Sequence, residues 1–245
     1  MEKYKRFFKN KTVIVTGHTG FKGSWLCLVL WLFGAKIIGI SSYNLGTKSN
    51  YKILKIGSKI NKEFKVDINN YKKLKRIFIK TKPDVVFHLA AQSLVSKSVI
   101  NPLETFNTNI LGTINLLDTL RYLKKKCSVV IVTSDKCYLN RELTRGYNEN
   151  DILGGIDPYS ASKACAEINF KSYFNSYFKD NKLISLATAR AGNVIGGGDF
   201  SHNRILPDII RSLINKKVLK IRNPKSTRPW QHVLEPLRGY MDLSI

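Results

Sequence analysis

The sequence predicts an α/β protein built on a doubly wound parallel sheet, and three observations lead to this prediction. Short apolar runs rich in β-branched residues alternate at least five times with longer stretches of helical periodicity. Three glycines lie between the first apolar run and the first expected helix. Small or polar residues follow the ends of several runs, which is where an open parallel sheet binds its ligands. Strands and helices that alternate in this way form a parallel sheet with helices on both faces.

The first strand, expected at 12–16, leads into a glycine turn. Gly17 allows the tight turn, Gly20 leaves room for a pyrophosphate near the backbone, and Gly23 lets the next helix pack closely. The apolar run at 25–33 continues this helix, whose first N–H groups face the anion. The spacing is G-x-x-G-x-x-G, and an ordinary loop is the alternative. The strand–turn–helix context nevertheless predicts dinucleotide binding.

The second strand, expected at 35–41, ends without the acidic residue that usually binds the ribose hydroxyls of NAD. Ser41, Ser42 and Tyr43 stand there instead, and no arginine is present to bind the 2′-phosphate of NADP. These residues therefore leave the choice between NAD and NADP open. The polar stretch at 44–62 predicts an irregular excursion.

The rest of the chain continues the alternation. Strands are expected at 64–67, 85–89, 128–133 and 183–189, and helices at 71–80, 102–125 and 157–178. Asp67, at a strand end, is placed either to contact an adenine or to cap the following helix. His88 lies inside an apolar strand, which favours a hydrogen-bonded core histidine over a catalytic one. Ala90 and Ala91 are small enough to let a cofactor lie against the backbone.

Tyr159 and Lys163 are four residues apart and therefore share one face of a helix. A phenol is a weak base at its ordinary pKa of about 10, and a nearby ammonium lowers that pKa by stabilising the phenolate. The pair is suited to removing a proton from a sugar hydroxyl while a hydride leaves the carbon. A surface Tyr and Lys without a role is the alternative, but the glycine turn and the strand that ends at Ser134 favour catalysis.

Seven motifs together resemble the extended short-chain dehydrogenase/reductase superfamily with its Rossmann fold, the NAD-dependent epimerase/dehydratases, and among these the CDP-glucose 4,6-dehydratase family. They are Gly17-His-Thr-Gly-Phe-Lys-Gly-Ser-Trp25, His88-Leu-Ala-Ala-Gln92, Asn107-Thr-Asn-Ile-Leu-Gly112, Thr133-Ser-Asp-Lys-Cys-Tyr138, Tyr159-Ser-Ala-Ser-Lys163, Arg190-Ala-Gly-Asn-Val-Ile-Gly-Gly-Gly-Asp199 and Arg228-Pro-Trp-Gln-His232. The Lys-Gly-Ser-Trp and Ser-Asp-Lys-Cys-Tyr versions are distinctive of the CDP-glucose branch. The other motifs are shared with sugar-nucleotide epimerases and other dehydratases.

The resemblance implies a lyase that converts CDP-glucose to CDP-4-keto-6-deoxyglucose with NAD, on a route to deoxysugars of surface polysaccharide. It implies that Tyr159 takes the C4 hydroxyl proton while Lys163 stabilises the phenolate. Ser134 donates a hydrogen bond to the C4 oxygen, and Asp135 protonates the departing C6 hydroxyl. The hydride removed from C4 returns to C6, so the cofactor stays bound through the cycle.

The base that removes the C5 proton has two candidates. Related dTDP-glucose dehydratases carry Asp-Glu where this chain has Asp135 and Lys136. A lysine acts as a base only when neutral, so burial or a neighbouring cation such as Lys163 must lower its pKa. Our hypothesis is that Lys136 is the base. The alternative is that Lys136 only binds a hydroxyl and Tyr159 removes both protons.

The resemblance also implies which residues bind cofactor and substrate. The expected cofactor-binding residues are Gly17, Thr19, Gly20, Phe21, Lys22, Gly23, Asp67, Ile68, Leu89, Ala90, Ala91, Gln92, Asn109, Thr133, Tyr159 and Lys163. The expected substrate-binding residues are Ser93, Asn193, Arg204 and Arg228. The two arginines suit bidentate phosphate pairing, and Asn109 is expected to support the active-site backbone.

The chain stops at Ile245, whereas the family's chains are longer and place much of the substrate-binding domain beyond that point. We therefore expect a dinucleotide-binding domain over 1–189 and an incomplete substrate-binding lobe over 190–245, with residues from about 228 returning to the first domain. A fragment, a natural truncation and one part of a split gene are the three interpretations. The chain alone is expected to bind NAD, and to bind CDP-glucose weakly.

The net charge of +24, from 41 Lys and Arg against 17 Asp and Glu, has two explanations. A basic surface attracts nucleic acid without sequence preference. The lysines, however, are spread along the chain without interleaved stacking aromatics. This distribution favours solvated helix faces and small anionic substrates over nucleic acid.

Location and assembly are the last expectations. Cys27, Cys127, Cys137 and Cys165 show neither C-x-x-C nor metal-ligand spacing, which predicts reduced thiols, a cytoplasmic protein and no metal site. The first residues lack the apolar core of a signal peptide, and no apolar run approaches the ~20 residues that span a bilayer. The resemblance implies a homodimer through helices near 103–125 and 157–178.

Two alternatives to the dehydratase remain open. A nucleotide-sugar 4-epimerase would use Tyr159 and NAD but would not need Asp135 and Lys136. A truncated binding protein would hold NAD without turnover.

Overall fold

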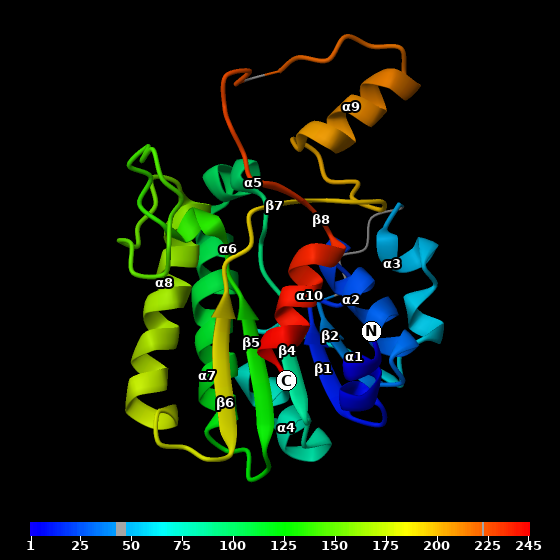
Figure 1. The fold of residues 1–245 in the computed structure, drawn as a ribbon, viewed down its shortest axis with the longest axis vertical. Helices are drawn as coiled ribbons and strands as arrows, with labels where there is room; N and C mark the ends of the chain where they lie inside the picture. The colour runs from blue at the N-terminus through cyan, green and yellow to red at the C-terminus, as the bar shows by residue number, and fades with distance from the viewer. Residues whose placement is uncertain (43–47, 222) are drawn as a thin grey trace.

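The central feature of the protein is one parallel sheet, seen in a computed structural model that describes residues 1–42, 48–221 and 223–245. Within these residues the sheet has six strands in the order β3-β2-β1-β4-β5-β6 (Figure 1). They are β1 (Thr12–Thr16), β2 (Lys36–Ser41), β3 (Lys62–Lys65), β4 (Val85–His88), β5 (Cys127–Val132) and β6 (Ile184–Ala189). All neighbours are parallel. The strand order reverses between β1 and β4, which opens a crevice at their carboxyl ends. The predicted doubly wound sheet is confirmed.

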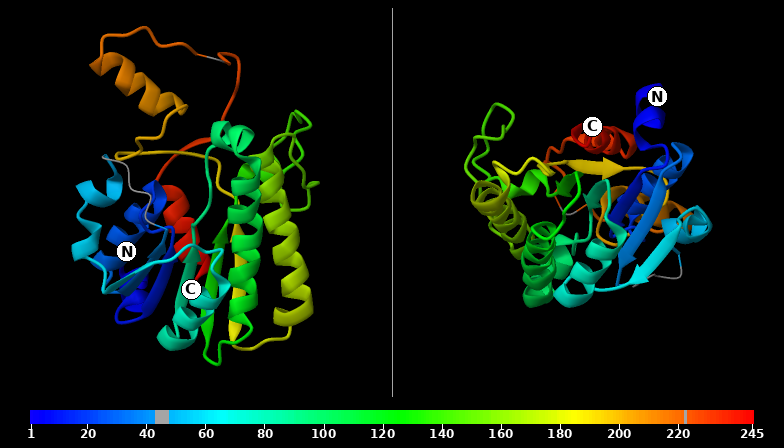
Figure 2. Two further views of the ribbon diagram at one scale, coloured as in Figure 1. Left: turned by 180° about the vertical axis from the view of Figure 1, so that it is seen from behind. Right: turned by 90° about the horizontal axis from the view of Figure 1, so that it is seen from below.

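Helices cover both faces of the sheet (Figure 2). One face carries α1 (Glu2–Phe8), α2 (Phe21–Leu32) and α10 (Leu234–Leu243), and the other carries α4 (Tyr71–Thr81), α7 (Gly112–Leu120) and α8 (Pro158–Tyr173). Successive β1 side chains point to opposite faces. Val13 and Val15 join the cluster of α1, α2 and α10, whereas Ile14 joins the cluster of α4 and α7. A strand buried on both sides explains the unbroken apolar run of β1.

Shorter elements gather mostly at the carboxyl edge of the sheet. They are α3 (Asn50–Ile53), η1 (Ile56–Ser58), α5 (Val95–Ile100), α6 (Pro102–Phe106), η2 (Asn107–Leu111), η3 (Asp135–Cys137), η4 (Phe174–Phe178), β7 (Asn193–Ile195), α9 (Ile205–Ile214) and β8 (Trp230–His232). β7 and β8 form a separate parallel pair. α9 stands away from the sheet (Figure 1), whereas α10 packs back against it through Leu237 and Met241. The described residues of 190–221 and 223–232 supply the upper wall of the crevice.

The helix predicted at 102–125 is wrong as a single element. It is divided into α6, the π-helical turn η2 and α7, and α7 ends at Leu120. The π turn brings Asn109 inward, where its side chain pairs with the backbone of Gln92. Periodicity cannot reveal this interruption because both halves keep an apolar face.

Two predictions near the second and third strands also need correction. β3 covers Lys62–Lys65 rather than 64–67, because its pairing with β2 ends at Ser41 and Lys65. The stretch predicted to be irregular at 44–62 contains α3, which Ser49 caps, and η1. Tyr43 and residues 44–47 lie outside the described part of the chain.

Candidate active site

The glycine turn at the end of β1 is shaped by two close approaches. Gly17 has a φ of 71°, and a Cβ there would lie 2.7 Å from the backbone nitrogen of Ala90. A Cβ on Gly23 would collide with the carbonyl of Gly17, so this glycine brings α2 against the turn. A Cβ on Gly20 would meet only the carbonyl oxygen of Gly17, at 3.3 Å. Gly20 lies at the helix start, where the unpaired backbone N–H groups suit a phosphate group.

A cavity of about 1620 Å³ lies at the carboxyl ends of the strands. Pockets for one drug-sized ligand are typically about 300–1,000 Å³, so this one has room for a dinucleotide and a second ligand. Most residues predicted to bind or react line it, namely Gly17, Thr19, Gly20, Phe21, Lys22, Gly23, Asp67, Ile68, Leu89, Ala90, Ala91, Gln92, Ser93, Thr133, Ser134, Asp135, Lys136, Tyr159, Asn193, Arg204 and Arg228. Asn109 and Lys163 lie behind this wall. The fold thus collects residues from seven separated motifs at one place.

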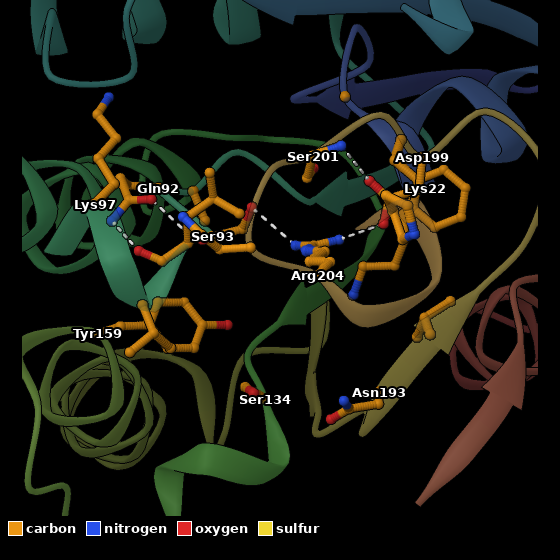
Figure 3. A pocket seen from close by; sticks show the side chains of 18 of the residues that line it. Lys22, Gln92, Ser93, Lys97, Ser134, Tyr159, Asn193, Asp199, Ser201 and Arg204 are labelled. Atoms are coloured by element: carbon orange, nitrogen blue, oxygen red, sulfur yellow. Dashed lines mark hydrogen bonds and ion pairs between the residues drawn. The ribbon is translucent and has the colours of Figure 1, made fainter. Parts of the chain in front are cut away.

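Tyr159 projects from the start of α8 into the cavity, near Ser134 (Figure 3). Burial raises the pKa of its phenol, and the charge of Asp135 acts in the same direction. A hydrogen bond with Ser134 and the charge of Arg204 lower that pKa but do not cancel the effect of burial. The expected lowering of the Tyr159 pKa is therefore not met in this structure. The ammonium of Lys163 instead donates to the carbonyl of Val132, with the two atoms 3.3 Å apart.

Two lysines near Tyr159 lose protons more readily than usual. Burial lowers the pKa of Lys163 to about 8, although the charge of Glu167 acts against it. Burial, followed by the charges of Lys163 and Arg204, lowers the pKa of Lys22 to about 7. Its Nζ lies 3.3 Å from the hydroxyl oxygen of Tyr240 on α10. Buried cations in a cleft mark a place where proton transfer near neutral pH is feasible.

Ser134, Asp135 and Lys136 form a tight turn directly after β5. The hydroxyl of Ser134 donates to Oδ1 of Asp135 over 3.0 Å and accepts from the N–H of Lys136 over 3.2 Å. The N–H of Asp135 donates to the carbonyl of Ala191. This turn presents a hydroxyl, a carboxyl group and an amine to the cavity within three residues.

Asn109 braces the wall rather than lining it. Its Oδ1 accepts from the N–H of Gln92 over 2.8 Å, and its Nδ2 donates to the carbonyl of Gln92 and to the hydroxyl of Ser162. The side chain of Gln92 is itself engaged with Leu94 and Thr105. Both residues therefore fix the backbone between β4 and α8, which agrees with the supporting role expected of Asn109.

The part of the cavity where an adenine is expected is lined by the hydroxyls of Thr19 and Ser41 and by the carboxylate of Asp67. Asp67 lines the cavity and accepts from the N–H of Asn69, whereas Asn70 caps α4. Thr19 and Ser41 join through their hydroxyls at 2.7 Å. The alternative that Asp67 caps the following helix is therefore wrong, because Asn70 is the N-cap.

His88 is a core residue, as its apolar strand predicted. Its Nδ1 lies 2.8 Å from the hydroxyl of Thr16, and its Nε2 lies 3.4 Å from that of Thr113. Burial lowers its pKa to about 3, which keeps the imidazole neutral.

Two of the expected substrate residues meet across the cavity (Figure 3). Arg204 pairs with Asp199 at 2.9 Å and reaches the hydroxyl of Ser93 at 3.5 Å. Arg228 is exposed at the rim. Asp199 was not among the predicted site residues. Its place at the end of the glycine motif 196–199, five residues before Arg204, is the signal that could have indicated this ion pair.

Glu167 was not predicted to take part in the site, yet its buried carboxylate contacts three side chains at the ends of two strands. It accepts hydrogen bonds from Thr133 and Thr188 and pairs with Arg190 at 2.8 Å. Its position four residues after Lys163 is the signal that could have identified it.

Two features are absent from the part of the chain that the structure describes. No group of three or more His, Cys, Asp or Glu side chains there could hold a metal ion. Nor is any helix there long and apolar enough to span a bilayer.

Comparison with known proteins places these features in context. The model of the GDP-mannose 4,6 dehydratase family matches residues 14–244. The chain is 47% identical to the CDP-glucose 4,6-dehydratase of Salmonella typhimurium, over 97% of this chain and 67% of that protein. It is 32% identical to the dTDP-D-glucose 4,6-dehydratase of Dictyostelium discoideum, over 90% of this chain and 52% of that protein. The chain thus spans about half to two thirds of these relatives.

Solved structures show the same fold. The epimerase Mth375 of Methanothermobacter thermautotrophicus superposes with a TM-score of 0.85 and 28% identity, covering 99% of this chain and 70% of that one. A double mutant of the dTDP-glucose 4,6-dehydratase DesIV of Streptomyces venezuelae, with NAD bound, gives a TM-score of 0.80. At 24% identity, over 94% of this chain and 70% of that one, this second likeness shows the fold alone.

Proposed function

Since this chain belongs to the family described by the GDP-mannose 4,6 dehydratase model, we propose that it is an NAD-dependent dehydratase of CDP-glucose. One observation carries the proposal: Tyr159 and the turn Ser134–Asp135–Lys136 share one cavity with the glycine turn. The 47% identity to a CDP-glucose 4,6-dehydratase favours that substrate. The product would be CDP-4-keto-6-deoxyglucose.

The cavity fits NAD through residues already described. The pyrophosphate would lie over Gly20 and the N–H groups of Phe21 and Lys22, which line the cavity. Asp67 and Ile68 would contact the adenine, and Leu89 to Gln92 would line the path to the nicotinamide. When bound, the nicotinamide accepts a hydride from C4 and returns it to C6. We infer NAD as the cofactor because the superposed dehydratase DesIV holds NAD on the same fold.

The chain's own residues move the protons. Tyr159 removes the C4 hydroxyl proton, and Ser134 donates a hydrogen bond to the same oxygen. The resulting 4-ketone acidifies the C5 proton, which Lys136 removes. Asp135 then protonates the leaving C6 hydroxyl, so that water departs. The proton taken by Lys136 returns to C5 as the hydride is delivered to C6. Because burial raises the Tyr159 pKa, its phenolate needs nearby cations, and the charge of Arg204 acts in that direction. We assign the same role to Lys163, four residues further along α8.

We assign substrate binding mainly to residues of the upper wall of the cavity. Asn193, Arg204 and Arg228 are suited to a diphosphate, and Ser93 to a hexose hydroxyl. We propose residues 1–189 as the dinucleotide-binding domain and 190–245 as an incomplete substrate-binding lobe, with α10 returning to the first. The separate pair β7–β8 and the exposed helix α9 support this division.

We further propose a cytoplasmic homodimer. Four unpaired cysteines agree with a reducing compartment. Apolar side chains are exposed along the neighbouring helices α6, η2 and α8, with Leu103 77%, Leu111 50% and Ile168 55% exposed. A second copy of the chain would cover them as a bundle of helices.

Incubation of the purified chain with CDP-glucose tests the function. We expect a keto sugar, detected by its absorbance in alkali, and a product lighter by one water. A product of unchanged mass would indicate the epimerase alternative. If NAD binds but no product forms, the chain is a binding protein without turnover, or one that needs a further segment.

A further inference from the structure

Glu167 is the third residue of one helical face. Tyr159, Lys163 and Glu167 follow at intervals of four along α8 and point toward the sheet. The carboxylate of Glu167 is 3% exposed. A buried carboxylate stays ionised only when donors and cations surround it.

The three partners of Glu167 come from the ends of two strands, β5 and β6. Oε1 accepts from the hydroxyl of Thr133, which lies directly before Ser134. Oε2 accepts from the hydroxyl of Thr188 in β6 over 3.0 Å and from Nη2 of Arg190 over 2.8 Å. One carboxylate therefore ties α8 to the ends of two strands.

We propose that Glu167 is a positioning residue for the dehydration: its carboxylate holds the Ser134–Lys136 turn in place against Tyr159 and supplies the counter-charge to the ammonium of Lys163. The inference rests on the proposed function. A residue that only stabilised the fold would affect neither the pH dependence of turnover nor the titration of Lys163.

The groups that face Lys163 make Glu167 its source of negative charge. Cys137 approaches from η3, and burial raises its pKa to about 12, so the thiol is neutral. His88 approaches from β4 and is neutral above a pKa of about 3. Lys22 approaches from α2 and repels the ammonium. Among these groups only the carboxylate favours the charged form of Lys163.

The sign of the pH effect follows from this arrangement. Burial lowers the pKa of Lys163 to about 8, and the charge of Glu167 raises it. Without that charge the pKa falls further, so the ammonium is lost at a lower pH. Turnover that needs the ammonium then declines earlier as the pH rises.

The variant pair Glu167→Gln and Glu167→Asp separates charge from shape. In Glu167→Gln we expect kcat to fall about tenfold with KM little changed, and the alkaline limb of the kcat profile to move down by about one pH unit. Glu167→Asp keeps the charge, so the alkaline limb of its kcat profile should stay near that of the parent chain. Its shorter side chain should lower kcat. An unchanged alkaline limb in Glu167→Gln overturns the inference.

Loss of one charge could leave Arg190 buried without its partner and unfold the variant. The double variant Glu167→Gln with Arg190→Met removes both charges and should show the same shift of the limb. An unchanged limb there also overturns the inference.

Nuclear magnetic resonance of the lysine ammonium groups gives a readout without turnover. The Lys163 signal, assigned by its absence in Lys163→Arg, should titrate at a lower pH in Glu167→Gln than in the parent chain. If it does not move, the inference fails. If the parent chain makes no keto sugar, the proposed function fails, and this titration still decides the role of Glu167.

Discussion

A substitution of Lys136 tests which residue removes the C5 proton. Its side chain lines the cavity beside Asp135, and a neutral amine there could remove the C5 proton. In Lys136→Ala we expect exchange of the C5 hydrogen with deuterated water to fall by 100-fold or more, a size typical of a lost base, while hydride transfer from C4 continues. Mass spectrometry of recovered sugar nucleotide measures the exchange, and the absorbance of reduced nicotinamide measures the hydride step.

Exchange at the parent rate in Lys136→Ala would instead assign both proton removals to Tyr159. Lys97→Ala is a matched control because Lys97 also lines the cavity but pairs with Glu104 at the surface. Its exchange rate should stay near that of the parent chain.

The same Gly→Ala substitution is expected to lower stability at Gly23 and to raise it at Gly239. Gly23→Ala places a Cβ against the carbonyl of Gly17 and 2.8 Å from Cα of His18, so we expect α2 to shift and both stability and NAD affinity to fall. Gly239→Ala in α10 meets nothing within 4 Å and should raise the free energy of unfolding by about 0.5–1 kcal/mol. Thermal unfolding and calorimetry with NAD check both variants. Unchanged NAD binding in Gly23→Ala would contradict the role of this close approach.

The π turn η2 places Asn109 against the loop after β4, where its side chain pairs with the backbone of Gln92. Asn109→Ala leaves the N–H and carbonyl of Gln92 and the hydroxyl of Ser162 short of a partner. We expect a loss of about 2 kcal/mol or more in the free energy of unfolding, together with lower turnover. Thr119→Val removes a buried hydroxyl from the neighbouring helix α7 and is the control, with a smaller expected loss. Chemical denaturation measures both, and equal losses would contradict a special role for Asn109.

Strands β1, β2, β4 and β5 could be predicted from the sequence because they are buried on both faces and therefore consist mostly of apolar residues. β7, β8 and α9 could not, because they are short or exposed and bury little apolar surface. The glycine turn and the Tyr159–Lys163 spacing were local signals. The direction of the Tyr159 pKa depends on burial by distant segments, which spacing in one helix does not reveal.

Glu167 was missed for the same reason. A glutamate within a helix usually faces solvent. Its burial depends on Thr133, Thr188 and Arg190, which lie about 20 to 35 positions away in the chain. Only the assembled edge of the sheet shows what the carboxylate does.

The molecule as an assembly is expected to dimerise through the exposed apolar side chains of α6, η2 and α8. Ile168→Glu places a charge among them and should convert the dimer to a monomer, measured by light scattering. Val218→Glu, at a side chain that is 91% exposed beyond α9, should leave the dimer intact. A parent chain that is monomeric at micromolar concentration would contradict the expectation, and a dimeric Ile168→Glu would place the interface elsewhere.

The contact between α1 and α10 has a consequence for how the protein is made. Asp242 accepts from the hydroxyl of Tyr4 over 3.0 Å, and Phe8, Leu30 and Leu237 share one buried cluster. A chain leaves the ribosome with its N-terminus first, so α1 and α2 wait until the whole six-stranded sheet has been made before α10 arrives to cover them. During that interval the nascent chain displays an apolar face that chaperones recognise. The arrival of α10, rather than growth of the sheet, then becomes the step at which this face is withdrawn from them.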